Sequence, residues 1–138
     1  MTAKAFVDSN VLIYAVSNRR DEAAKAKTAR EILNRSDIGF SVQVFQEFHV
    51  NATRKIKRPI AHEDSIAFIK TLTRFPVQPL SADVMFYALN LQDRFQLSYW
   101  DAAILAAANF LKASILYTED LNPGQKYDSV TVENPFAN

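Results

Sequence analysis

The stretch AKAFVDSNVLIYAV, residues 3–16, is the segment that decides the fold class. Its first part, Ala3–Val7, is a short apolar run that fits a buried strand, and the polar residues Asp8, Ser9 and Asn10 end that run. The following run, VLIYAV, predicts a short helix. A buried strand that passes through a turn into a helix is the first half of a β-α unit, with Asp8 at the carboxyl end of the strand.

The rest of the chain repeats this alternation of strands and helices. Ser114–Thr118, SILYT, is a second continuous apolar run, and Glu119, Asp120 and the turn residues NPG close it. Apolar runs without polar alternation are typical of strands buried on both faces, so the sequence predicts an α/β fold with a mostly parallel sheet covered on both faces. The other predicted strands are Ile38–Val42, residues 77–80 and Asp128–Val132. The other predicted helices are Asp21–Leu33, Gln43–Lys57, His62–Arg74, Ser81–Phe95 and Ser98–Lys112.

Length and composition predict one globular domain over residues 1–138, because 49% hydrophobic and 22% charged residues are close to the averages of soluble domains. The absence of cysteine excludes disulfides, thiolate zinc sites and cysteine nucleophiles, and it agrees with a cytoplasmic location. No secretory signal is visible, and no uncharged run approaches the roughly 20 residues that a membrane helix needs. We therefore expect no membrane span.

Charge, glycine content and histidine content exclude several function classes. The net charge of +1 does not favour nucleic acid, so only a local patch could bind it. The candidate patch is Arg54, Lys55, Lys57 and Arg58, which taken alone also fits a solvated helix end. The chain has two glycines, far apart, which excludes a dinucleotide fingerprint and a phosphate-binding P-loop. Its two histidines do not support a histidine-rich metal site or a histidine acid/base nuclease.

Four acids are predicted to meet at one edge of the sheet. Asp8 and Asp120 follow predicted strands, Glu47 lies on the helix that leaves the second strand, and Asp101 begins the helix before the strand at 114–118. Because ligands in such folds bind beyond the carboxyl ends of the strands, these acids are the candidate catalytic residues. Asp101 has an alternative role, because Ser98-x-x-Asp101 matches a capping box. We expect its carboxylate to face buried surface, since residues 102–111 carry no charge.

The convergence of these acids predicts a divalent metal. Two unit charges about 4 Å apart repel each other by roughly 4 kcal/mol at an effective dielectric constant near 20, whereas a helix cap contributes only about 1 kcal/mol. Protons or cations must offset that repulsion, and oxygen-only ligands favour Mg²⁺ or Mn²⁺. Asn10, Asn51 and Thr118 lie close to the acids in the sequence, and we expect them to orient carboxylates or metal-bound water.

The segments FVDSNVLIYA, QVFQEFHVNATRK, LSYWDAAILAAA and ILYTEDLNPGQ resemble, in this order, the acidic motifs of PIN-domain nucleases, particularly VapC-like toxins. The resemblance implies a PIN-like three-layer α/β/α domain with a central mostly parallel sheet. It also implies an Mg²⁺- or Mn²⁺-dependent endoribonuclease that leaves a 5′-phosphate and a 3′-hydroxyl. Asp120 matches the Thr-x-Asp pattern of the family better than Glu119 does. By position, the metal site would be Asp8, Glu47, Asp101 and Asp120, supported by Asn10 and Thr118.

The same resemblance implies a homodimer, an RNA substrate and a cognate VapB-like antitoxin that blocks the site. The basic patch would then hold RNA phosphates, and Phe40, Phe45 and Tyr99 are candidates for base stacking, with core packing as their alternative. Two other functions remain open at this stage. One is a PIN-like module that binds RNA or protein without cleavage. The other is a receiver-type phosphotransfer domain, which needs a lysine near the acids where this chain has Thr118, Glu119 and Asp120.

Overall fold

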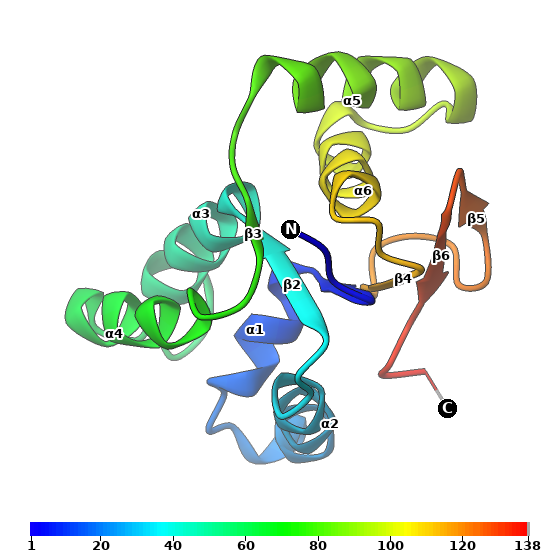
Figure 1. Cartoon of the computed structure of the whole chain (residues 1–138). Helices are drawn as coiled ribbons and strands as arrows, with labels where there is room; N and C mark the ends of the chain where they lie inside the picture. Colours follow the sequence, from blue (N-terminus) through cyan, green and yellow to red (C-terminus); the bar gives the residue numbers. More distant parts are fainter. Residues whose placement is uncertain (138) are drawn as a thin grey trace.

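The computed structural model describes residues 1–137 and confirms the predicted α/β class. Within these residues a six-stranded sheet has the strand order β3-β2-β1-β4-β6-β5 (Figure 1). All neighbouring strands pair in parallel except β5, which runs antiparallel to β6. The strands are β1 (Ala5–Val7), β2 (Ile38–Ser41), β3 (Val77–Gln78), β4 (Ile115–Tyr117), β5 (Lys126–Tyr127) and β6 (Val130–Glu133).

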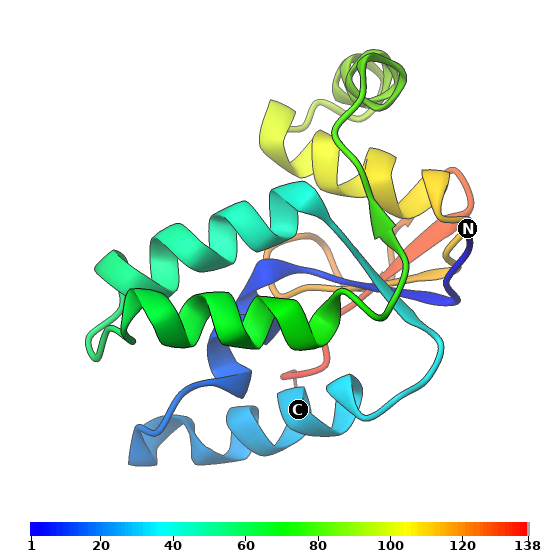
Figure 2. The same cartoon turned by 60° about the vertical axis from the view of Figure 1, so that its left-hand side comes forward.

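Helices cover both faces of the sheet, which gives the predicted three layers. Figure 2 shows α2 on one face and α6 on the other, with α5 outside α6. Helix α3 packs against both α1 and α4. The helices are α1 (Ser9–Ala15), the 3₁₀ turn η1 (Arg20–Glu22), α2 (Ala23–Leu33), α3 (Val42–Val50), the π-helical turn η2 (Asn51–Lys55), α4 (His62–Leu72), α5 (Ala82–Phe95) and α6 (Tyr99–Phe110).

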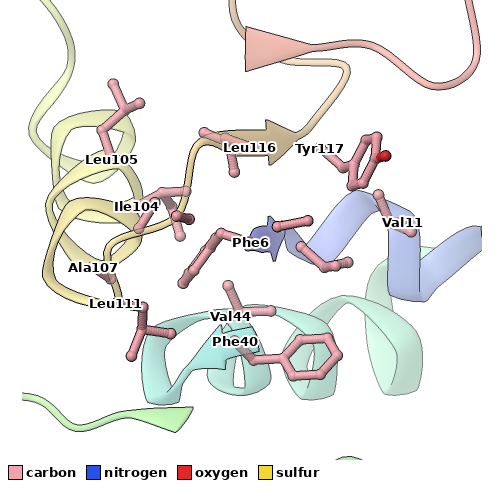
Figure 3. Packing of buried hydrophobic residues seen from close by; sticks show 14 of the residues in the cluster. Phe6, Val11, Phe40, Val44, Ile104, Leu105, Ala107, Leu111, Leu116 and Tyr117 are labelled. Atoms are coloured by element: carbon pink, nitrogen blue, oxygen red, sulfur yellow. The ribbon is translucent and has the colours of Figure 1, made fainter. Parts of the chain in front are cut away.

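The core explains why α6 has no charged face. Its seven residues Ala102–Ala108 are all buried, because α5 covers the side of α6 that faces away from the sheet. Leu105 on α6, Phe6 on β1, Phe40 on β2 and Leu116 on β4 are fully buried in one cluster (Figure 3). No helix within residues 1–137 combines the length and the apolar character needed to cross a membrane.

The single helix predicted for Gln43–Lys57 is two elements, so this prediction is wrong in detail. Helix α3 ends at Val50, and the chain continues as the π-helical turn η2 to Lys55. The Thr53 hydroxyl donates a hydrogen bond to the His49 carbonyl (2.7 Å), a contact that competes with the regular helical pattern and distorts it. Beyond the turn, the Ile60 N–H donates to the Ala52 carbonyl (2.9 Å), which folds the basic segment back onto η2.

The strand ends also differ from the sequence prediction. Strand β2 stops at Ser41 because the Ser41 hydroxyl caps α3 by accepting a hydrogen bond from the Val44 N–H (3.2 Å). Strand β3 has only two residues, since Pro79 lacks the N–H that a longer ladder would use. Strand β5 was not predicted, because its two residues form a strand only by pairing with β6 across a turn that contains Asp128 in the left-handed conformation (φ 55°).

Candidate active site

Asp8 is the most buried of the four predicted acids. It follows β1 and caps α1: its Oδ1 accepts a hydrogen bond from the Ser9 N–H (2.7 Å). Its Oδ2 accepts from the Thr118 hydroxyl (2.8 Å), which comes from the end of the neighbouring strand β4. The side chain is therefore fixed by both strands, and only 6% of the residue is exposed.

Asp120 is tied to Asp8 through two polar side chains, Asn10 and Thr118. The Asn10 Nδ2 donates to Asp120 Oδ2 (3.1 Å), to Thr118 Oγ1 (3.0 Å) and, at 3.5 Å, to Asp8 Oδ2. Thr118 Oγ1 also accepts from the Asp120 N–H (3.1 Å), so its one proton and both lone pairs are used. Asn10 and Thr118 thus lie where supporting residues were expected.

Glu47 and Asp101 reach the same end of the sheet from α3 and α6. The Ser9 hydroxyl donates to Glu47 Oε1 (3.4 Å), which places Glu47 beside the first turn of α1. The Ser98 hydroxyl accepts from the Asp101 N–H (3.2 Å), so the expected helix cap forms. Asp101 is half-buried, which corrects the expectation that it faces only buried surface, because its place in the first helical turn leaves one side open.

The charges of these acids act on one another. Burial, together with the charges of Glu47 and Asp120, raises the pKa of Asp8 to about 7, although the hydrogen bonds from Thr118 and Ser9 oppose this rise. Burial is also the main cause that raises the pKa of Glu47, followed by the charges of Asp101 and Asp120. All four acids therefore share one electrostatic site.

The donor set fits a divalent cation, although within residues 1–137 no group of three or more acidic, histidine or cysteine side chains is already arranged to hold one. The side-chain atoms of the four acids that could bind a metal are all oxygens, the ligand type that Mg²⁺ and Mn²⁺ prefer. The Asn10 Oδ1 atom is buried and has no hydrogen-bond partner, so an acceptor is available for a cation or its water. A cation would also relieve the repulsion between the acids.

A hollow of about 320 Å³ opens beside Asn10 and Asp120, and Asn51 and Lys55 line it. Asn51 also lies beside Glu47 in a second depression, but it makes no side-chain hydrogen bond to Glu47 in the described part of the chain. Lys55, Lys57 and Arg58 line a further hollow of about 330 Å³ next to the first. Of the predicted basic patch, Lys55 therefore borders the acidic site, Lys57 and Arg58 line the neighbouring hollow, and Arg54 is exposed but lines none of these hollows.

The aromatic residues at the site differ from those named in the sequence analysis. Phe40 and Phe45 are core residues (0% and 8% exposed), so neither can stack on a base. Tyr99 is half-buried. Trp100 is 65% exposed directly before Asp101 and was missed, although its position next to a candidate acid was a usable signal.

A comparison with protein-family models matches the PIN domain to residues 5–127. The chain belongs to the PIN domain family. All four acids lie within the matched region. Membership removes the receiver-type alternative, and it agrees with the absence of a lysine at the end of β4.

Solved structures share this fold at low sequence identity, whereas no curated protein matches the chain. A toxin–antitoxin complex from Klebsiella pneumoniae is 22% identical with a TM-score of 0.71, over 96% of this PIN domain chain and 98% of that chain. The sarcin–ricin loop cleaving toxin VapC20 from Mycobacterium tuberculosis is 20% identical with a TM-score of 0.66, over 84% of this chain and 89% of that chain. DNA-bound VapBC from Salmonella typhimurium is 18% identical with a TM-score of 0.69, over 97% and 99%.

Proposed function

We propose that this PIN domain is a divalent-metal-dependent endoribonuclease and the toxin of a VapBC-type toxin–antitoxin pair in the cytoplasm. The observation that carries the proposal is the acidic end of β1 and β4, where Asp8 and Asp120 are joined through Asn10 and Thr118. The structural similarity to VapC20, a toxin described as cleaving the sarcin–ricin loop, supports RNA as the substrate class.

In this proposal Asp8, Glu47, Asp101 and Asp120 hold Mg²⁺ or Mn²⁺. When bound, the metal lowers the pKa of water and polarises a phosphodiester. Asn10 and Thr118 fix the Asp8 and Asp120 carboxylates, and Asn51 at the edge of the hollow offers an amide to bound water or RNA.

RNA reaches an acidic site only if cations at its border hold the phosphates, and the basic patch supplies them. Lys55 lines the hollow beside Asp120, and Lys57 and Arg58 line the adjacent one. Removing Lys55 and Arg58 is expected to reduce the salt slope of RNA binding by about 0.7 for each lost phosphate contact. An unchanged slope would remove the patch from the proposal.

The antitoxin partner is proposed from the similar structures, which include toxin–antitoxin complexes, and the homodimer is proposed from the resemblance of the sequence motifs to VapC-like toxins. A cognate VapB-like antitoxin would cover the acidic site, and a homodimer would cover the apolar surface beside it. Leu80, Met85 and Trp100 line one apolar hollow, and Phe86 and Leu89 lie on the same helix as Met85; each of the five is 40% or more exposed. An exposed apolar surface of this kind is typical of protein interfaces.

The first test is titration of Mn²⁺ into the purified chain, followed by RNA cleavage with and without a chelator. Asp101→Asn is expected to weaken Mn²⁺ binding and abolish cleavage while the fold stays intact. Asp64→Asn is the matched control, because Asp64 occupies the third position of α4, as Asp101 does in α6, and is exposed. Its binding and cleavage should equal those of the parent chain.

Full cleavage by Asp101→Asn would refute the role of Asp101. Absence of both Mn²⁺ binding and cleavage in the folded, partner-free parent chain would favour the alternative, a PIN-like module that binds RNA or protein without cutting it.

A further inference from the structure

Two adjacent acids, Glu119 and Asp120, follow β4, and helix α1 holds them apart. Asn10 on α1 donates to Asp120 Oδ2 (3.1 Å). Tyr14, four residues later on the same helix, donates its hydroxyl proton to Glu119 at 3.0 Å from Oε1 and 3.2 Å from Oε2. Residues four apart lie on one helix face, so a single stripe of α1 contacts both acids and directs each to a different place.

The Tyr14 side chain is itself held from two sides. Phe136 packs edge to face against its ring, with 4.7 Å between the ring centroids. The Lys25 ammonium lies 4.9 Å from the Tyr14 ring centroid, donates to the Tyr14 hydroxyl (3.3 Å) and lies 3.9 Å from Glu119 Oε2. Glu119 therefore has a hydroxyl donor and a cation of its own, which Asp120 lacks within residues 1–137.

Glu119 is nevertheless within reach of the acidic site. Glu119 and Asp120 both line the hollow of about 320 Å³ that adjoins Asn10. A glutamate side chain is one methylene longer than an aspartate, so a released Glu119 could turn into this hollow and compete with Asp120 for a cation. The contacts with Tyr14 and Lys25 prevent that movement.

We infer that Tyr14 and Lys25 are positioning residues that hold Glu119 out of the acidic site, so that Asp120 is the acid of this pair that faces Asp8. The inference rests on the proposed function, because it concerns which side chains are available to a divalent cation. It goes beyond that proposal by assigning a role to three residues outside the predicted metal site.

The test is a double-mutant cycle read by calorimetric titration of Mn²⁺ into the metal-free chain. Tyr14→Phe keeps the ring and its packing on Phe136 but removes the hydrogen bond to Glu119. We expect Tyr14→Phe to bind Mn²⁺ at least threefold more tightly, since a fifth carboxylate reaches the site. Glu119→Gln alone should leave the Mn²⁺ affinity within twofold of the parent chain. The variant with both substitutions should match Glu119→Gln.

The cycle separates positioning from structural support, because a purely structural effect of Tyr14→Phe would change Mn²⁺ affinity equally in both backgrounds. That equal change, or no change in either background, would overturn the inference while leaving the proposed function intact. A strong loss of Mn²⁺ affinity in Glu119→Gln would make Glu119 a ligand and overturn it as well. A parent chain that binds no Mn²⁺ would refute the proposed function and this inference together.

Lys25→Met provides a second measurement on the same point. It removes the cation that contacts both Tyr14 and Glu119, so it should also tighten Mn²⁺ binding. If Lys25 acts by positioning Glu119, the gain in Mn²⁺ affinity caused by Lys25→Met should disappear when Glu119→Gln is also present. If Lys25→Met raises the Mn²⁺ affinity by the same factor in the Glu119→Gln background, Lys25 acts only through its positive charge, and its positioning role is refuted.

Discussion

Asp8 at the end of β1 and Asp128 in the turn between β5 and β6 are the same residue type in opposite surroundings. Asp128 accepts two hydrogen bonds from the Arg94 guanidinium (2.9 and 2.7 Å) and one from the Tyr87 hydroxyl, and these contacts lower its pKa. Asp8 is buried beside Glu47 and Asp120, and its pKa is raised to about 7. Asp128, which stabilises the fold, lies next to a cation, whereas the nearest charged groups to Asp8 at the candidate site are other acids.

This contrast separates structural from functional acids in a chain rich in both. Arg35 donates to both oxygens of Asp37 (2.8 Å each) and lowers its pKa, so Asp37 belongs with Asp128. Clustered acids whose pKa values rise are costly to the fold, and they are typical of catalytic and metal sites. The comparison therefore favours a functional role for the end of β1 and β4, independently of any motif.

Among variants that keep all four candidate acids, the largest expected effect comes from breaking the contact between the two strands at the acidic site. Thr118 is fully buried and donates to Asp8 while it accepts from Asn10 and Asp120. Thr118→Val keeps the volume but removes these bonds, and we expect RNA cleavage to fall by about 10- to 100-fold, as for lost outer-shell partners of metals. Cleavage rates at saturating Mn²⁺ measure the effect.

The control for that variant is Thr131→Val on β6, where the Thr131 side chain makes no hydrogen bond within the described residues. It should cleave RNA like the parent chain. Equal loss in both variants would show that the effect comes from sheet stability and not from the site.

The second prediction concerns stability of the metal-free chain as a function of pH. The folded-state pKa of Asp8 is about 7, above its unfolded value of 3.8, so the folded state holds a proton that the unfolded state has lost. Asp8 therefore makes the free energy of unfolding fall as pH rises from about 4 to 7, with a slope approaching 1.4 kcal/mol per pH unit. Denaturant titrations at several pH values measure it.

Asp8→Asn should remove the Asp8 contribution to this slope and leave the part that comes from Glu47, whose pKa is also raised. Asp128→Asn should retain the whole slope, because the lowered pKa of Asp128 places its own effect at more acidic pH. The interpretation of Asp8 would fail if the metal-free parent chain gained stability over this pH range and Asp8→Asn did not alter the trend.

The smallest effect is expected at the compensated acid. Arg94→Met leaves Asp128 without its cation, but the two side chains are 43% and 32% exposed, so solvent screening keeps the loss of stability small at neutral pH. The loss should shrink as pH falls through the folded-state pKa of Asp128, because protonation removes its charge in the parent chain too. Thermal unfolding at pH 7 and pH 3 checks this, and RNA cleavage should be unaffected.

Much of the fold was predictable because each strand and helix has a local signature. The buried strands at 5–7 and 115–117 were visible as apolar runs, and the uncharged segment after Asp101 was visible as a buried helix. The π-helical turn η2 and strand β5 were not predictable, since one depends on how the chain folds back at Ile60 and the other on pairing with β6.

At the candidate site, the sequence indicated which acids follow the strands, but not how each is held. The hydrogen bond from Thr118 to Asp8 joins residues 110 positions apart, and that from Tyr14 to Glu119 joins residues 105 apart. The sequence favoured Asp120 over Glu119 as the site acid only because Asp120 matches the Thr-x-Asp pattern of the family. The structure supplies a physical basis, because Asn10 contacts one acid and Tyr14 contacts the other.

The sequence by itself therefore determined the α/β class, the order of the elements and the placement of acids after parallel strands, because periodicity and turn chemistry are properties of neighbouring residues. Only the tertiary structure decided that Trp100 is exposed while Phe40 is buried, and that Asp8 is held among acids while Asp128 meets Arg94. The burial and the pKa of a side chain depend on groups that folding brings from distant parts of the chain, and no local pattern contains them.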